Sequence, residues 1–160
     1  MTENERIIKK IYGYFDNITP IKADCGMICN NKCCKGNDTD GMLLFPGEEK
    51  FFKEKDGFNV FYDSRYGYNV VSCSGVCNRS ERPLSCRIFP YFIYASSSDN
   101  LSVAPDLRAS DFCPLLTEEF SISKDFLRAL RISAKLMESN IEYVDFLKKI
   151  TAVLTDFNNL

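Results

Sequence analysis

Four cysteines lie within ten residues of this chain, and no other feature constrains its fold as strongly. The stretch reads Cys-Gly-Met-Ile-Cys-Asn-Asn-Lys-Cys-Cys and contains Cys25, Cys29, Cys33 and Cys34. Polar, turn-forming residues precede the last two, so we expect a folded loop here. Adjacent Cα atoms lie about 3.8 Å apart, whereas a relaxed disulfide needs roughly 4.4–6.8 Å, so the vicinal pair does not simply bond to itself. Each thiol therefore needs its own partner.

Four further cysteines follow the first cluster, at Cys73, Cys77, Cys86 and Cys113. Clustered thiolates are the ligands of structural zinc sites and of iron–sulfur clusters. Two stoichiometries fit: eight thiolates bind two zinc ions, or four hold one zinc ion or cluster while the others are packed thiols. All eight are candidate metal ligands; if some are not ligands, we expect these to be Cys34, the second member of a vicinal pair, and Cys113, which stands alone.

The cellular compartment decides between metal binding and disulfides. The N-terminus MTENERIIKK has no apolar signal core, and no apolar run approaches the length of about 20 residues that a membrane span needs. We therefore expect a cytoplasmic protein, in which cysteines remain reduced and favour metal. Histidine is absent, which excludes zinc sites and catalytic triads that use it.

Length and charge limit the organisation and the partners of the chain. Its 160 residues, 45% of them apolar, suit one domain, with a metal-binding core at about 20–115 and C-terminal helices at about 117–158. The formal net charge is −2, so no general basic field attracts nucleic acid or an acidic membrane. We expect a metal ion as the partner, and neither nucleic acid nor membrane.

Local patterns predict the elements of an α+β fold. A capping box at Thr2–Glu5 predicts a helix over roughly 3–15. Pro46, followed by Glu48 and Glu49 in a first turn, predicts another over about 47–54. Aromatic and β-branched runs predict two hairpins, at 58–62 with 66–71 and at 88–94 with 101–104. Pro83 predicts the start of a short helical turn.

The last third of the sequence has helical periodicity. Ser123 is placed to cap a first helix, and Ser139–Asn140 separates it from a second. The apolar seam over 143–157 of the second helix can pack within the domain or receive a protein partner. The expected fold is a small cysteine-rich α+β domain with metal-stapled loops, short β-hairpins and a C-terminal helical hairpin.

Charged residues near the cysteines are candidates for supporting roles. A zinc ion with four thiolates carries a charge of −2, which nearby cations and hydrogen-bond donors offset. Arg82 and Arg87 are our candidates for this role, and Arg79 and Arg108 also lie near cysteines in the sequence.

Two adjacent carboxylates, Glu48 and Glu49, can be read as an acid/base pair or as additional metal ligands. We expect them instead to be solvated carboxylates in the first turn of the helix at 47–54.

Several motifs between residues 25 and 114 resemble the CxxCxxCC family of zinc- or iron-chelating bacterial proteins. The matching residues are Cys25 with Cys33-Cys34, Cys73-x3-Cys77, Arg82-Pro83-x2-Cys86-Arg87-x-Phe89-Pro90 and Cys113-Pro114. The first cluster is spaced by three residues where the family name implies two, and Ser80 stands where the family has tyrosine. The resemblance implies metal chelation. It also implies a remote link to protein methylation, because the family is similar to a domain of flagellin lysine methylases.

The sequence thus predicts a metal-binding protein that chelates zinc or an iron–sulfur centre through its cysteine cluster. Two alternatives remain: a metal-dependent enzyme related to protein lysine methylation, and a zinc-stapled module whose C-terminal helices bind a protein. Zinc and iron both accept thiolates, so sequence does not distinguish between them.

Overall fold

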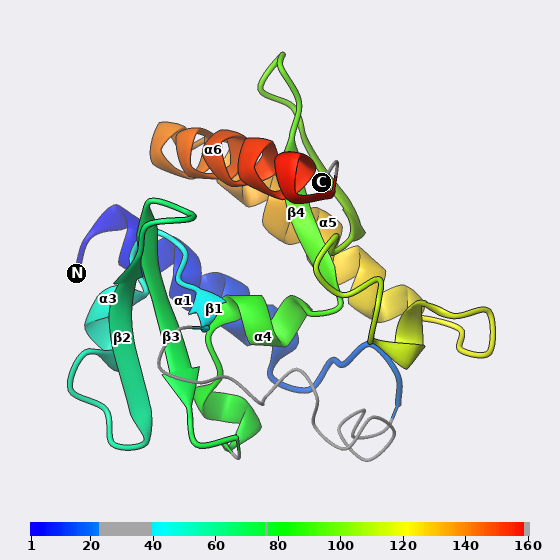
Figure 1. Ribbon diagram of the computed structural model, residues 1–160, viewed down its shortest axis with the longest axis horizontal. Coiled ribbons are helices and arrows are strands. Elements are labelled where there is room, and N and C mark those ends of the chain that lie inside the picture. Colours follow the sequence, from blue (N-terminus) through cyan, green and yellow to red (C-terminus); the bar gives the residue numbers. More distant parts are fainter. Residues whose placement is uncertain (23–39, 76, 159–160) are drawn as a thin grey trace.

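The described part of the chain contains two small antiparallel sheets, three long helices and several short helical segments (Figure 1). The structure is a computed structural model that describes residues 1–22, 40–75 and 77–158. Helices and antiparallel strands occur together, so the predicted α+β class is confirmed.

The first sheet contains β1 (Met42–Leu43), β2 (Phe58–Asp63) and β3 (Tyr68–Cys73) in the order β1-β3-β2. Both pairings are antiparallel, and the β2–β3 register places Phe58 opposite Cys73. The predicted first hairpin is confirmed. The intervening helix α3 (Glu49–Phe52) is shorter than predicted, because Gly47 has a φ of +96° that a right-handed helix does not allow.

The second sheet is the hairpin of β4 (Tyr91–Ala95) and β5 (Leu101–Pro105), which confirms the predicted pairing. The predicted strand start at residue 88 is wrong, because Ile88 ends a short helix. It follows η2 (Arg79–Glu81) and α4 (Leu84–Ile88), and Pro83 is the N-cap of α4. After the hairpin, η3 (Pro114–Leu116) precedes the C-terminal helices.

The long helices begin at the capping signals that the sequence carries. Helix α1 (Glu3–Phe15) starts with the capping box of Thr2 and Glu5, and α5 (Lys124–Glu138) starts at Ser123, whose hydroxyl accepts a bond from a backbone N–H. Helix α6 (Ile141–Asn158) follows at once. The predicted helical hairpin is therefore present.

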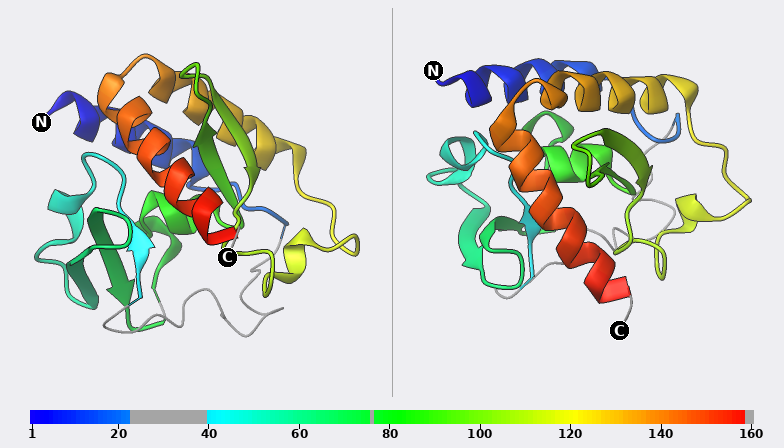
Figure 2. Two further views of the ribbon diagram at one scale, coloured as in Figure 1. Left: turned by 45° about the horizontal axis from the view of Figure 1, so that its top comes forward. Right: turned by 90° about the horizontal axis from the view of Figure 1, so that it is seen from above.

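Helices cover the second sheet and form one side of the molecule. Helix α6 packs on β4 and α5 packs on β5, while α1 lies beside α5 (Figure 2). The main core lies between these elements. The seam of α6 belongs to this core, since four of its apolar side chains are fully buried: Tyr143, Leu147, Ile150 and Leu154. These four side chains are therefore not exposed to a partner.

None of the described helices combines the length with the apolar character that crossing a membrane requires.

Candidate functional site

The second cysteine cluster is distributed over four structural elements. Cys73 ends β3, Cys77 precedes η2, Cys86 lies inside α4 and Cys113 is the N-cap of η3. All four are half-buried. The first cluster, Cys25, Cys29, Cys33 and Cys34, lies outside the described residues.

Within residues 1–22, 40–75 and 77–158, no three cysteine, histidine or acidic side chains come close enough together to hold a metal ion. The second cluster therefore does not complete a metal site from its own residues. The predicted ligand set stays a prediction, and it depends on cysteines from the first cluster.

A small cavity of about 30 Å³ lies next to Cys86. It has room for one or two water molecules. The cavity is bordered by the end of α1 and the chain after it, by the segment that includes η2, and by α4: Phe15, Ile18, Thr19, Pro20, Arg79, Arg82, Cys86, Arg87 and Phe89. Three arginines thus share a cavity with a candidate ligand.

Arg87 is the buried centre of this region, with a side chain that is only 2% exposed. Its Nε donates to the carbonyl of Arg82 at 2.7 Å, and its Nη2 donates to that of Ser80 at 2.8 Å. Its Nη1 lies 3.2 Å from Asp16 Oδ1, and the guanidinium stacks 4.2 Å from the ring centre of Tyr12. Arg87 therefore fixes the segment before α4 against α1.

Glu48 fixes the beginning of α4 from the other side. It is fully buried, and its Oε1 accepts hydrogen bonds from the Tyr12 hydroxyl and from the Leu84 N–H, the latter at 2.7 Å. Its Oε2 accepts from the Phe45 N–H at 2.7 Å. Burial raises the pKa of Glu48 to about 7, although these three donors and the nearby Arg87 act to lower it.

The expectation that Glu48 is solvated is wrong, whereas Glu49 is exposed as expected. The reason is that Glu48 precedes α3 and turns back toward the amides of Phe45 and Leu84. The sequence signal for this was the apolar run over 43–45, directly before the turn. Its three side chains are buried, and they bring the neighbouring carboxylate into the interior.

Contacts with other elements fix the chain on both sides of residues 23–39. The Ser123 N–H donates to the Pro20 carbonyl at 2.8 Å, which ties residue 20 to the start of α5. On the far side of residues 23–39, Arg65 Nη2 lies 3.0 Å from Asp40 Oδ1. Both flanks of the first cluster are therefore anchored.

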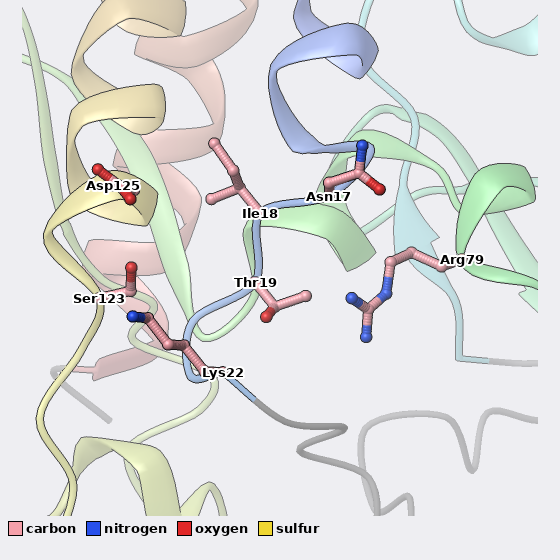
Figure 3. Close-up of a pocket in the computed structure, with 7 residues that line it drawn as sticks. All are labelled: Asn17, Ile18, Thr19, Lys22, Arg79, Ser123 and Asp125. Carbon is pink, nitrogen blue, oxygen red and sulfur yellow. The ribbon is translucent and has the colours of Figure 1, made fainter.

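A larger hollow of about 500 Å³ adjoins the cavity beside Cys86. The two spaces share Ile18, Thr19 and Arg79. Figure 3 shows the segment of Ile18 and Thr19 running between the start of α5 on one side and Arg79 on the other. Sequence reasoning missed this hollow, because its lining comes from segments about 100 residues apart and no local pattern marks it.

The candidate arginines have different surroundings. Arg82 and Arg87 border the cavity with Cys86, and their supporting role at a metal stays a prediction. Arg108 forms a 2.6 Å ion pair with the buried Asp106 and stacks on Phe92. These contacts explain the presence of Arg108 without a metal.

Comparison with known proteins gives no identification: no protein-family model, no curated protein and no solved structure matches this chain.

Proposed function

We propose that this protein binds zinc or iron through thiolates drawn from both cysteine clusters. The observation that carries the proposal is the cavity beside Cys86, whose wall includes residues 18–20 of the chain leading to Cys25. Cys25 lies five positions after Pro20. An extended chain covers at most about 18 Å over that length, so Cys25 is within reach of Cys86.

The other flank supports the same convergence. Strand β1 begins eight residues after Cys34 and pairs with β3, which ends at Cys73. The chain that leads into the first cluster thus borders the cavity of Cys86, and the chain that follows the cluster joins the strand that leads to Cys73. A metal site with thiolates from both clusters is consistent with the positions of both flanks.

The surroundings of Cys86 suit a negatively charged thiolate site. Arg79 and Arg82 border its cavity, and buried thiolates around a divalent ion leave a net negative charge that such cations offset. Since the described residues hold no complete set of ligands, Cys25, Cys29, Cys33 and Cys34 would supply the remaining thiolates. When bound, the metal would staple the loops of the domain.

Metal analysis of protein purified without oxygen tests the proposal. We expect at least one equivalent of zinc or iron per chain. A colourless metalloprotein would identify zinc, and a brown protein with broad charge-transfer absorption would identify an iron–sulfur centre. A content below about 0.3 equivalents, with thiols still reduced, would contradict metal binding.

Single substitutions distinguish a shared site from two separate ones. We expect Cys29→Ser and Cys86→Ser to lose the same metal, because each removes one thiolate from a common set. Loss of half the metal in each variant would instead indicate two independent sites. Asn78→Ala is the matched control, since Asn78 is exposed beside Cys77 and makes no capping hydrogen bond. It should retain its metal.

A metal-dependent enzyme is the second candidate, related to protein lysine methylation as the family resemblance implies. The observation that favours it is the hollow of about 500 Å³ adjoining the Cys86 cavity. Catalysis at the metal needs an open coordination position. The absorption spectrum of cobalt-substituted protein would reveal such a position as coordination by fewer than four thiolates. A spectrum typical of four thiolate ligands would argue against an enzyme.

A further inference from the structure

The hollow between α5 and η2 has the size of a small-molecule site. Its volume of about 500 Å³ falls within the range of roughly 300–1,000 Å³ typical of ligand pockets. Seven of the described residues line it: Asn17, Ile18, Thr19, Lys22, Arg79, Ser123 and Asp125. Ile18 is the one apolar member of this set, so the lining suits a polar ligand.

The charges of the lining have opposite signs. Lys22 and Arg79 contribute two cations and Asp125 contributes one anion. None of the ion pairs found in residues 1–22, 40–75 and 77–158 engages any of these three side chains. In Figure 3, Asp125 lies on the α5 side and the guanidinium of Arg79 extends from the opposite side. Among the described residues, therefore, no ion pair occupies either sign of charge in the lining.

Neutral polar groups lie between the charges. The Ser123 hydroxyl accepts a hydrogen bond from the Phe126 N–H at 3.4 Å and can still donate. The Thr19 hydroxyl donates to the Ile21 carbonyl and can still accept. The Asn17 amide, which is exposed at the edge, can do both.

We propose that this hollow binds a small acidic amino-acid derivative or short peptide that carries two carboxylates and one ammonium group. The carboxylates would face Arg79 and Lys22, and the ammonium group would face Asp125. This charge count complements the three charges that the described residues contribute to the lining, and the volume accommodates a dipeptide. The proposal does not depend on metal binding, although a bound molecule would lie next to the cavity of Cys86.

Binding of three dipeptides to the full chain, measured by ligand-observed NMR titration, tests the proposal. Ala-Glu carries both carboxylates and the ammonium group, Ala-Gln lacks one carboxylate, and N-acetyl-Ala-Glu lacks the ammonium group. We expect Ala-Glu to bind about two- to fivefold more tightly than either analogue, the range for exposed charge pairs, because Lys22 and Asp125 are exposed. Equal binding of all three, or no binding of Ala-Glu at millimolar concentration, would overturn the proposal.

Variants assign each charge to its partner. Arg79→Gln should weaken the binding of Ala-Glu. This variant should still bind Ala-Glu more tightly than N-acetyl-Ala-Glu. Asp125→Asn should remove the preference for the free ammonium group. Arg128→Gln is the matched control, because Arg128 is exposed on α5 and does not line the hollow. An unchanged preference in Asp125→Asn, with a normal melting midpoint, would refute the assigned orientation.

Discussion

Glu48→Gln removes a buried charge while keeping the size of the side chain. In the wild type, the two carboxylate oxygens accept from three donors, the Tyr12 hydroxyl and the N–H groups of Leu84 and Phe45. A glutamine amide has one oxygen, so in either orientation its NH₂ group faces at least one of these donors. A buried donor left without an acceptor costs about 1–3 kcal/mol. We expect a loss of this size in the free energy of unfolding at pH 5, where the buried carboxyl is protonated and its hydroxyl oxygen can still accept a hydrogen bond, which an amide nitrogen cannot.

The cost of Glu48→Gln should also depend on pH, and the raised pKa sets the direction of this dependence. Burial raises the pKa of Glu48 from 4.5 to about 7, so between these values the unfolded chain releases a proton that the folded protein keeps. The contribution to stability is fully present below pH 4.5 and is lost as the pH rises through about 7. Each tenfold change in proton affinity is worth about 1.4 kcal/mol, which gives about 3 kcal/mol over this window. Glutamine does not titrate, so the cost of Glu48→Gln should fall by most of this amount from pH 5 to pH 8, and at pH 8 the variant should be about as stable as the wild type or more stable.

Urea unfolding of wild type, Glu48→Gln and Glu49→Gln at pH 5 and pH 8 measures this difference. Glu49 is the exposed neighbour, so its variant should stay within about 0.5 kcal/mol of wild type at both pH values. A cost of Glu48→Gln that grows with pH would show that the three donors stabilise the anion more than burial destabilises it. That result would refute the direction of the pKa change.

Three further substitutions probe the supports of the site. Arg87→Lys should lower the free energy of unfolding by about 2–3 kcal/mol, since one ammonium group cannot span the carbonyls that the guanidinium joins; denaturant titration with Arg128→Lys as the control would measure it. Gly47→Ala should destabilise the protein more than Gly57→Ala. Both glycines have a positive φ, but only a Cβ at residue 47 would lie 2.8 Å from the backbone of another segment, at Asn4. Equal melting midpoints of the two variants would contradict this close approach. Tyr143→Phe should cost about 1 kcal/mol in thermal unfolding, because its buried hydroxyl bonds to backbone carbonyls, and a neutral result would count against those bonds.

Local signals in the sequence determined most of the secondary structure. The capping box at Thr2 and Glu5, the cap at Ser123 and the start of α4 after Pro83 all act over a few residues, so they can be read without the fold. The two hairpins were also predictable, because aromatic and β-branched runs separated by turns carry their own pairing signal. The eight cysteines defined the candidate chemistry in the same way.

Tertiary structure alone decided the environment of the charged residues. Glu48 and Leu84 are 36 positions apart, and Arg87 and Asp16 are 71 positions apart, so no periodic pattern connects them. Burial converts Glu48 from an ordinary surface carboxylate into a group with a raised pKa, and it makes Arg87 a link between α1 and α4. The hollow has the same origin, since residues 17–22, 79 and 123–125 become neighbours only when the chain has folded. Pairing and burial between distant segments depend on how the whole core packs, which a local pattern does not contain.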